Sequence, residues 1–438
     1  MFDYLQRKLN NILAYMNLLE LNCHNLKNES RIKKVQDRNV RKLMRKAYKI
    51  PFYRAKFDAI GKTPSDFKTA ADLVNFPLLT KNEIRNWIST ELENNPKKYQ
   101  HWYRVTTSGS TGTPLMICVS PAENARLTAN WLRIISNAGV NPFTDKTMAL
   151  KDPELIKQRK GKDSIVQKLG LLRRHVISFA SSGKTILDNL NSEKPDFLYI
   201  HRSKLMETIM YAERSKEQFH KPRLIAVIGE GIDKNAEALF DKHFEGRFFS
   251  SYGTMETGAC TYTPVGDTSK HIVTRDTHVI NIVNEKGELA QTGRMVLTNL
   301  FFYGFPIINY DIGDGAQIYT DPKSGLQYIS NIKGRINDII QFSDGSIVDW
   351  LSFYTVMERR ADVLQFRVVQ KEYDLLEIQL VKNPEKAIKT ESEICKEIEE
   401  ALRKVVQYQP VVYMFTWHDE LLPDKNGKRR FIVSEVKK

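Results

Sequence analysis

Apolar residues near the N-terminus recur every three or four positions, which is the spacing of one face of an amphipathic helix. Most such stripes pack against the body of their own protein, and we predict the same for this one. The residues of the stripe are Phe2, Leu5, Leu9, Ile12, Met16 and Leu19.

The segment after this stripe is strongly basic, and it leaves a second interpretation open. Nine Lys and Arg residues fall between positions 27 and 46. An apolar stripe beside a basic one is also typical of helices that lie on an anionic membrane surface. Residues 1–46 are therefore a candidate for peripheral membrane contact.

Between residues 116 and 251, short apolar runs alternate with stretches of helical period. Strands that alternate with helices indicate an α/β sheet, whose ligands gather at strand ends and in loops. The predicted strands are Met116–Val119, Asp196–Ile200, Leu224–Ile228 and Phe248–Ser251, and the predicted helices are Pro121–Gly139, Lys204–Ser215 and Asn235–His243.

The pattern changes twice in the remainder of the chain. From His271 to Ile318 it is β-rich and antiparallel in character, and we predict a domain boundary just after Gly334. Beyond it, Leu364–Gln370 and Leu375–Val381 alternate as strands. The sequence thus predicts a mixed α/β fold, with a large multi-layer α/β N-terminal domain, its β-rich subdomain, and a small α+β C-terminal domain. An amphipathic helix of the small domain carries Ile394, Ile398, Leu402 and Val405.

The length of 438 residues exceeds what one core ordinarily supports, which agrees with more than one domain. The four cysteines lie far apart without a Cys-x-x-Cys pair, so neither a disulfide framework nor a structural zinc site is indicated. No apolar run approaches the roughly 20 residues that span a bilayer, and the N-terminus does not resemble a secretion signal. We therefore expect a cytoplasmic protein.

The formal net charge of +14 comes from 66 basic residues that are spread along the chain and mixed with 52 acidic ones. Diffuse positive charge attracts polyanions without specifying one, and the sequence has neither zinc-finger spacing nor a ribonucleoprotein signature. We expect a solvated basic surface rather than a specific nucleic-acid partner.

The stretch Thr106–Pro114 concentrates hydroxyls and glycines between apolar runs. Glycines allow a backbone to turn with its N–H groups directed at an anion, and Ser and Thr hydroxyls add donors, so such a loop can cradle phosphate. It differs from a Walker loop, because Gly112 is followed by Thr113 and Pro114. Taken alone, the cluster is equally typical of a solvated turn.

Four further polar clusters follow this loop, at Ser251–Glu256, Asn309–Gly315, Gly334–Asp338 and Leu422–Arg430. Each of them alone is typical of a structural turn or a surface loop. Together, in this order and with this spacing, they resemble the motifs of the adenylate-forming superfamily, the acyl-, aryl- and aminoacyl-activating enzymes.

Within that superfamily the chain looks most like the phenylacetate–coenzyme A ligase-like branch, which includes capsule-biosynthesis homologues. The similarity rests on the segments "RKLMRKAYKIPFYRAKFDAIG", "PRLIAVIGEGI" and "LTNLFFYGFPIINYDIGD", and it covers roughly residues 39–438. It implies a helical extension at residues 1–38, a large domain at 39–333 and a small mobile domain at 334–438.

The resemblance also implies a nucleotide site. Its Ser/Thr/Gly loop would hold the ATP phosphates, the ring of Tyr252 would lie against adenine, Asp314 would accept hydrogen bonds from the ribose, and Arg335 would brace that region. The implied phosphate contacts are Thr107, Ser108, Gly109, Ser110, Thr111 and Gly112, and the implied adenine pocket is Gly229, Glu230, Gly231, Ser251, Tyr252 and Gly253.

The same resemblance assigns catalytic roles. Glu256 would hold Mg²⁺, Lys428 would reach the site from the small domain, and Asp338 would be the hinge. The implied reaction uses ATP to activate a carboxylate as acyl-AMP with release of pyrophosphate, followed by transfer to a thiol, coenzyme A among them, or to an amine.

Two alternatives stay open. The protein would act in capsule or other surface-polysaccharide biosynthesis as an adenylyltransferase or ligase, or it would be a nucleotide-binding homologue that has lost turnover. The second is suggested by Met255, which stands where the superfamily usually has a Thr or Ser whose hydroxyl contacts a phosphate. Thr254 is the candidate replacement for that hydroxyl.

Two other departures from the family pattern concern metal and substrate. Cys260, His271 and His278 offer too few sulfurs for the zinc site of some relatives, so we predict packed or surface side chains. At Ile200–Ser203, polar and cationic residues replace a small-residue segment typical of relatives, which indicates either an anionic or sugar-like substrate or a surface loop.

Overall fold

The computed structural model of the protein contains two compact units. Unit 1 takes in the described residues up to Asp145 and Phe249–Ile332, and unit 2 takes in those of Lys146–Phe248 and those from Lys333 onward. The structure describes residues 2–24, 26–106, 115–151, 173–229, 231–232, 234–284, 286–335, 339–349, 353, 356–357, 360–384, 386–406, 408, 410–422 and 432–436.

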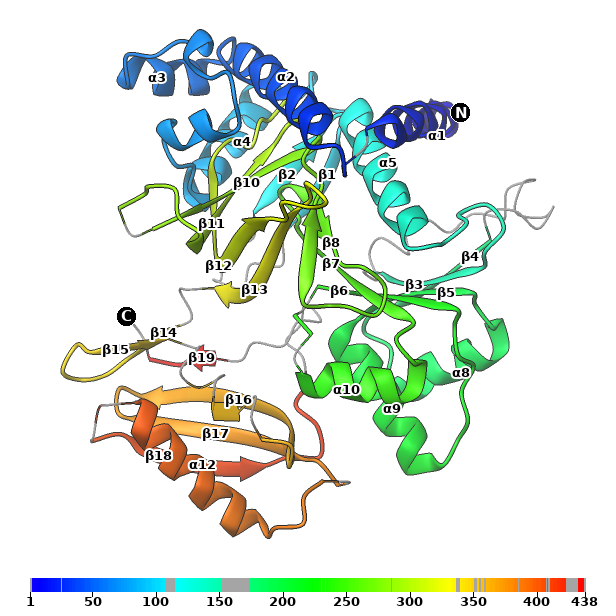
Figure 1. The fold of residues 1–438 in the computed structure, drawn as a ribbon, viewed down its shortest axis with the longest axis vertical. Coiled ribbons are helices and arrows are strands. Elements are labelled where there is room, and N and C mark those ends of the chain that lie inside the picture. Colours follow the sequence, from blue (N-terminus) through cyan, green and yellow to red (C-terminus); the bar gives the residue numbers. More distant parts are fainter. Residues whose placement is uncertain are drawn as a thin grey trace. The chain divides into compact units, whose positions relative to one another are not determined.

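The first part of unit 1 is mainly helical (Figure 1). Capping boxes begin two of its α-helices, with Thr80 and Glu83 at α4 and with Ser120 and Glu123 at α5. The second carboxyl oxygen of Glu123 accepts hydrogen bonds from the backbone N–H groups of Tyr303 and Gly304, at 2.6 and 2.8 Å. The elements are α1 (Phe2–Cys23), α2 (Glu29–Ala47), α3 (Pro51–Ala59), the 3-10 helices η1 (Pro64–Asp66) and η2 (Ala71–Asn75), α4 (Lys81–Asn94), β1 (Tyr103–Thr106), β2 (Met116–Val119) and α5 (Pro121–Asn137).

The second part of unit 1 consists of strands, which confirms the predicted β-rich character of this region. The strand order is β10-β11-β12-β13-β9-β8-β7, and the pairs β7 with β8, β8 with β9 and β10 with β11 are antiparallel. The strands are β7 (Phe248–Thr254), β8 (Gly258–Tyr262), β9 (Lys270–Val273), β10 (His278–Val283), β11 (Thr292–Asn299), β12 (Tyr310–Thr320) and β13 (Gln327–Arg335).

The structure corrects the prediction for the N-terminal helix. Ile12, Met16 and Leu19 are 58%, 62% and 67% exposed, so the predicted packing of that stripe on the protein is wrong for these residues. The opposite face of α1 packs on α5 instead, because small residues such as Ala14 and Ala129 let the two helices approach closely. From Asn10 onward, where side-chain burial is described, the buried residues of α1 are Asn10, Ala14, Leu18 and Leu21.

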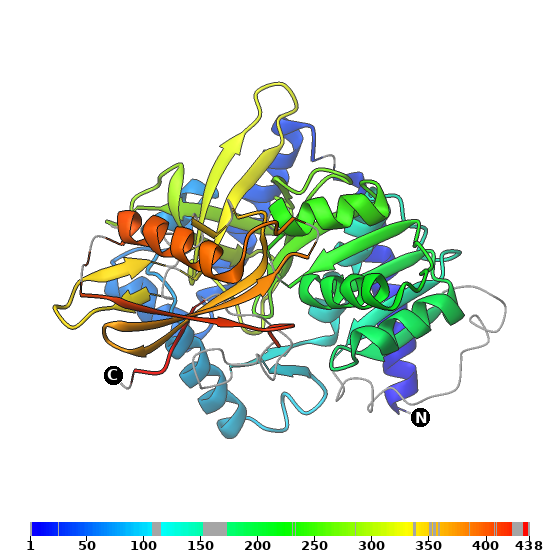
Figure 2. The same ribbon diagram turned by 90° about the horizontal axis from the view of Figure 1, so that it is seen from below.

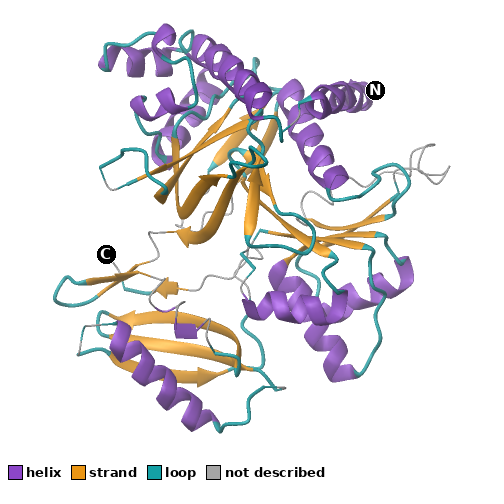
Figure 3. Cartoon of the chain, in the orientation of Figure 1, coloured by secondary structure: helices purple, strands orange, loops and turns teal. Residues whose placement is uncertain are grey.

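Unit 2 begins with parallel strands in the order β6-β5-β3-β4, alternating with helices as predicted (Figure 3). Buried aliphatic residues of the strands and phenylalanines of the last helix form its core. The elements are β3 (Thr147–Lys151), β4 (Arg174–Ser178), α8 (Gly183–Glu193), β5 (Phe197–His201), α9 (Arg202–Ser215), β6 (Leu224–Ile228) and α10 (Lys234–Phe244).

The C-terminal part of unit 2 has a four-stranded sheet in the order β18-β17-β16-β19, with α12 across one face (Figure 2). Ile394, Ile398 and Leu402 of α12 are buried as predicted, whereas Val405 is 40% exposed and Val406 is buried instead, because the helix ends at Val405. The elements are β14 (Ile339–Gln341), β15 (Ile347–Asp349), β16 (Val363–Glu372), β17 (Leu375–Lys382), α12 (Glu391–Val405), β18 (Val412–Trp417) and β19 (Ile432–Ser434).

The mixed α/β fold class is therefore confirmed. The domain limits at 38/39 and 333/334 stay a prediction. No helix among the described residues is both long enough and apolar enough to cross a membrane.

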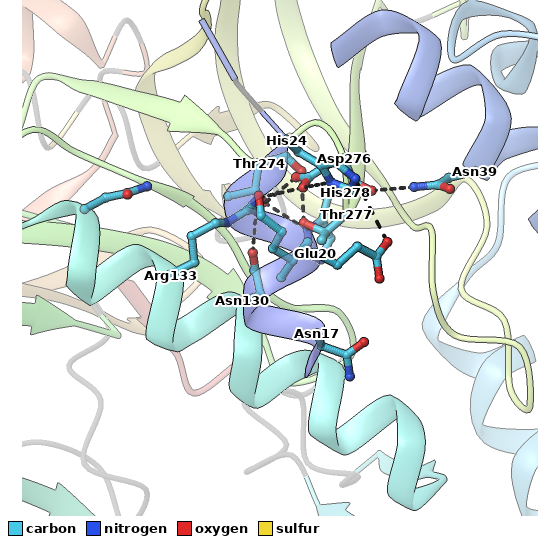
Figure 4. A network of polar contacts seen from close by, with 12 residues as sticks. Asn17, Glu20, His24, Asn39, Asn130, Arg133, Thr274, Asp276, Thr277 and His278 are labelled. Carbon is cyan, nitrogen blue, oxygen red and sulfur yellow. Dashed lines mark hydrogen bonds and ion pairs between the residues drawn. The ribbon is translucent and has the colours of Figure 1, made fainter. Parts of the chain in front are cut away.

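One residue, Asp276, joins α5, α2 and the end of α1 to the strands of unit 1 (Figure 4). Asp276, between β9 and β10, has a fully buried side chain that accepts hydrogen bonds from Arg133 of α5 at 2.6 and 2.9 Å. His24, directly after α1, donates from Nδ1 to the same carboxylate at 2.8 Å. Asn39 of α2 donates to the backbone carbonyl of Asp276 at 2.9 Å.

These donors also control the ionisation of Asp276. Burial alone would raise the pKa of its carboxyl group, but the charges and hydrogen bonds of Arg133 and His24 outweigh burial and hold the pKa well below its ordinary value. The carboxylate is therefore an anion throughout the neutral range, balanced by a guanidinium that is itself buried.

We expect Asp276→Asn to lower the free energy of unfolding by about 3–5 kcal/mol, because it leaves the Arg133 guanidinium buried without its counter-charge. Urea denaturation at pH 7 measures this. The matched control is Asp188→Asn, which removes an exposed ion pair with Lys184 and should change stability little. Equal unfolding free energies for Asp276→Asn and the parent chain would contradict this account.

Candidate active site

The described part of the predicted nucleotide site lies mainly on the β7–β8 hairpin and on β12. The other predicted residues are distributed as follows. Gly229 and Gly231 are exposed and belong to the loop after β6 in unit 2, and Arg335 ends β13. The phosphate loop from Thr107 to Gly112, and with it Glu230, Asp338 and Lys428, lies outside the described residues.

The hairpin has a tight geometry that requires glycine at two positions. A Cβ atom on Gly253 would lie 2.4 Å from the carbonyl oxygen of Gly258, and Gly258 itself has φ +77°. These glycines bring β7 and β8 together at the turn that carries Met255 and Glu256. Ser251 and Tyr252 lie within β7, before the turn. The strand is three residues longer than the predicted Phe248–Ser251, because the pairing with β8 extends through Thr254.

Tyr252 and Asp314, which are predicted to contact adenine and ribose, lie together. The Tyr252 hydroxyl donates a hydrogen bond to Oδ2 of Asp314 at 2.5 Å. Burial, together with the Asp314 charge, raises the pKa of Tyr252 well above its ordinary value, so the phenol keeps its proton and remains the donor.

A bulge in β12 places Asp314. Arg294 of β11 pairs with Gly315 and Val296 pairs with Asp311, so three residues of β12 stand opposite one of β11. Gly313, with φ +79°, is the residue within this segment that adopts the left-handed conformation. The ion pair of Arg294 with Asp311, at 2.7 Å, spans the same irregularity.

Glu256 is almost buried at the hairpin turn, with 8% of its surface exposed. Its Oε1 accepts a hydrogen bond from the Tyr310 hydroxyl at 3.2 Å. A carboxylate whose hydrogen bond with Tyr310 uses one oxygen suits Mg²⁺, which prefers oxygen ligands, keeps several waters and commonly shares substrate phosphates. The residue therefore fits its predicted role, and magnesium itself stays a prediction.

Two buried side chains hold the backbone next to Glu256, and sequence reasoning had not placed them in the site. The carbonyl oxygen of Thr257 accepts hydrogen bonds from Nε2 of His278 at 2.9 Å and from Nδ2 of Asn299 at 2.8 Å. Burial lowers the pKa of His278 to about 4, so its ring is neutral at pH 7 and donates from Nε2. The backbone carbonyl is thereby clamped by donors from β10 and β11.

The structure also places the residues at the other departures from the family pattern. Met255 is half exposed, and the Thr254 hydroxyl is engaged inside the turn, where the Thr257 N–H donates to it at 3.2 Å. Cys260 and His271, predicted to be packed or surface side chains, are both buried. Among the residues that the structure describes, no group of three or more His, Cys, Asp and Glu has metal-binding geometry.

In unit 2, the segment His201–Ser203 is not a surface loop. It ends β5 and begins α9, and both Arg202 and Ser203 are buried. The His201 ring lies against the backbone of Gly229, where a Cβ would be 2.6 Å from its Cδ2 atom. Of the two interpretations left open for this segment, the exposed-loop one is wrong.

Comparisons with known proteins agree with this architecture. No protein-family model matches the chain. Solved structures of 2-hydroxyisobutyryl-CoA ligase are similar to it in fold: one in the postadenylation state with R3-HIB-AMP has a TM-score of 0.73 at 15% identity, covering 92% of this chain and 89% of that one. Another, with 2-HIB-AMP and CoA in the thioesterification state, has a TM-score of 0.58 at 16% identity, with the same coverage.

The fold is therefore that of the AMP-forming ligases of the adenylate-forming superfamily. Among curated proteins, the phenylacetate-coenzyme A ligase of Escherichia coli strain K12 is 24% identical over 328 residues, which is 70% of this chain and 71% of that protein. These findings confirm the resemblance to the phenylacetate–coenzyme A ligase-like branch and the predicted enzyme class, and they agree with ATP and coenzyme A as the predicted small molecules.

We expect Tyr252→Phe to raise the dissociation constant for ATP about tenfold, because a hydrogen bond to a charged group is lost and Asp314 loses a group that orients it. The aromatic ring stays, so the change isolates the hydroxyl. Isothermal titration calorimetry measures it, with Tyr262→Phe on the adjacent strand β8 as the control. An unchanged affinity would show that the hydrogen bond has no part in nucleotide binding.

The two buried histidines predict acid sensitivity. Burial lowers the pKa of both His271 and His278 to about 4, below the ordinary value of 6.5. Between pH 6.5 and 4, these histidines are protonated in the unfolded chain but not in the folded chain. The free energy of unfolding therefore falls as the pH drops through this range, by about 3 kcal/mol per histidine. Urea denaturation at pH 7.0 and 4.5 measures the loss.

The control for this prediction is a pair of variants. His278→Asn removes the titrating ring but keeps an N–H near the Thr257 carbonyl, so it should shrink the acid-induced loss. His175→Asn, whose ring is 31% exposed, should leave the loss as it is in the parent chain. Identical pH dependence in the parent chain and His278→Asn would contradict the assignment.

Proposed function

We propose that the protein is an ATP-dependent ligase that activates a carboxylate as acyl-AMP, releases pyrophosphate, and passes the acyl group to the thiol of coenzyme A. The observation that carries the proposal is the hydrogen bond from Tyr252 to Asp314, on a hairpin whose turn holds the nearly buried Glu256. The ring of Tyr252, the carboxylate of Asp314 as a ribose acceptor and the carboxylate of Glu256 as a candidate metal ligand thus belong to one part of unit 1.

The site residues on the β7–β8 hairpin and on β12 each have a role in this proposal. Asp314 accepts hydrogen bonds from the ribose hydroxyls, and Tyr252 both orients Asp314 and offers its ring to adenine. Glu256 holds Mg²⁺, which supplies positive charge to the phosphates when bound. Ser251, Gly253 and Thr254 shape the strand that carries these groups.

The remaining roles rest on the family motifs alone. The backbone amides and hydroxyls of Thr107–Gly112 cradle the phosphates, with Gly229–Gly231 completing the adenine pocket. Arg335 braces the ribose, Asp338 serves as the hinge of a mobile domain at residues 334–438, and Lys428 reaches the reacting groups.

The chemistry requires alignment and charge neutralisation more than covalent participation by the protein. A carboxylate oxygen attacks the α-phosphorus of ATP, the bond to the β-phosphate oxygen breaks, and pyrophosphate leaves with the electron pair. The Lys428 ammonium stabilises the negative charge that develops on the phosphoryl oxygens. In the second half-reaction a thiolate attacks the acyl carbonyl, and AMP leaves.

Coenzyme A is the preferred acceptor in this proposal because the similar proteins are named as coenzyme A ligases, and one is solved with CoA. A cytoplasmic location fits substrates of that kind. A role in capsule or surface-polysaccharide biosynthesis and a silent nucleotide binder are less favoured, since neither accounts for those relatives. The acid itself stays open, because scattered side chains shape such a pocket.

The direct test is acid-dependent exchange of labelled pyrophosphate into ATP, measured across a panel of aryl, acyl and sugar acids. We expect exchange with one class of acid, reduced at least a hundredfold by Glu256→Gln and by Lys428→Ala. Glu288→Gln and Lys323→Ala, at exposed positions of unit 1, are the matched controls and should exchange normally. Exchange that needs no acid, or that survives both site variants, would overturn the proposal.

A further inference from the structure

Helix α1 has an apolar surface on both sides, and one side faces away from the protein. Its buried residues Asn10, Ala14, Leu18 and Leu21 pack toward α5. At 100° per residue, Ile12, Met16 and Leu19 lie on the opposite side of the helix, and more than half of each is exposed. A stripe of large exposed apolar side chains on one helix face marks an interaction surface.

Helix α2 has one buried face and one exposed, basic face. Its buried face consists of Ile32, Gln36, Val40, Leu43, Met44 and Ala47. Directly opposite that face runs a stripe of cations at three- and four-residue steps, all exposed, without an acidic residue among them. The members of this basic stripe are Arg31, Lys34, Arg38, Arg41 and Arg45.

Contacts with Asp276 attach both helices to unit 1. His24, after α1, and Asn39, in α2, both bind Asp276 (Figure 4). The charge of Arg38 also contributes to the lowered pKa of Glu20 near the end of α1, after the larger effect of Arg126. The helices that carry the apolar stripe and the basic stripe are therefore neighbours on the surface of unit 1.

We propose that this surface docks on an anionic phospholipid bilayer. The apolar stripe of α1 enters the boundary between headgroups and acyl chains, and the basic stripe of α2 contacts the lipid phosphates. Charge complementarity is the argument: residues 1–47 hold eleven Lys and Arg against four Asp and Glu, a net charge of +7, which is half of the +14 of the whole chain.

Other occupants fit this surface less well. A second copy of the chain would bring the same +7 segment against itself, so like charges would oppose association through α2. A nucleic acid would satisfy the basic stripe but would leave Ile12, Met16 and Leu19 in water. A bilayer satisfies both stripes.

Co-sedimentation of the full chain with vesicles tests the proposal. We expect binding to vesicles with 30% phosphatidylglycerol in phosphatidylcholine, weakening steeply with salt, and little binding to pure phosphatidylcholine. The triple variant Arg31→Gln, Lys34→Gln, Arg45→Gln should bind about 100-fold more weakly, as three surface cations contribute roughly 1 kcal/mol each. Met16→Ser with Leu19→Ser should also reduce binding at least tenfold.

Matched controls distinguish binding through the two stripes from nonspecific binding due to net charge or exposed apolar groups. Lys97→Gln, Lys286→Gln, Lys323→Gln removes the same charge from other exposed positions, and Leu289→Ser with Ile388→Ser removes apolar groups that are 49% and 99% exposed. Both controls should bind as the parent chain does. Thermal unfolding of every variant checks the fold.

The proposal fails if the parent chain stays in the supernatant, or if the controls lose binding as much as the stripe variants. It also fails if a 30-base oligonucleotide binds as tightly with no effect of Met16→Ser and Leu19→Ser on that or on vesicle binding. Dimerisation that Leu19→Ser abolishes, without vesicle binding, would assign the stripe to a second copy of the chain. None of these outcomes depends on ligase activity.

Discussion

The fully buried carboxylate of Asp276 is the constraint on which the arrangement of unit 1 depends. A buried charge is unfavourable unless every lone pair finds a donor, so its environment must be built to one geometry. Arg133 and His24 supply those donors from two separate helical regions, and Asn39 adds a bond to the backbone of the same residue. The helices of the N-terminal region are thus placed by polar contacts as well as by packing.

The same short loop leads to the candidate active site. Two residues after Asp276, His278 begins β10 and, together with Asn299 of β11, clamps the carbonyl of Thr257. Glu256 is the adjacent residue, and its carboxylate meets Tyr310 of β12. The position of the proposed metal carboxylate is therefore set by three strands, while the glycines at 253 and 258 allow the hairpin to close around it.

Local sequence patterns predicted the helices and strands well, but they predicted poorly which face of a helix packs on the rest of the protein. The strands Met116–Val119 and Leu224–Ile228 have the predicted bounds, because a short apolar run is a local property. For α1, the periodic spacing correctly predicted a helix, but the predicted buried face is exposed at Ile12, Met16 and Leu19. Asn10 lies on the buried side because its amide bonds to the Tyr103 hydroxyl, a contact between residues 93 positions apart. No periodicity carries that information.

The site shows the same division. The cluster motifs named Tyr252, Glu256 and Asp314, but the bond between Tyr252 and Asp314 joins positions 62 residues apart and depends on the bulge in β12. His278 and Asn299 act on a backbone carbonyl, so their contribution has no sequence signature. His278 was predicted only to be a packed or surface side chain. It is packed, and its ring bonds to the Thr257 carbonyl and to the hydroxyls of Thr274 and Thr277.

The central claim is that a carboxylate oxygen attacks the α-phosphorus of ATP, and oxygen labelling tests it most directly. The protein would be incubated with ATP, Mg²⁺, coenzyme A and an acid whose carboxyl oxygens are both ¹⁸O. Mass spectrometry would then measure the ¹⁸O content of the AMP and of the thioester. The account predicts one ¹⁸O atom in each AMP and one in the thioester. AMP without the label, or ADP and phosphate as the products, would contradict it.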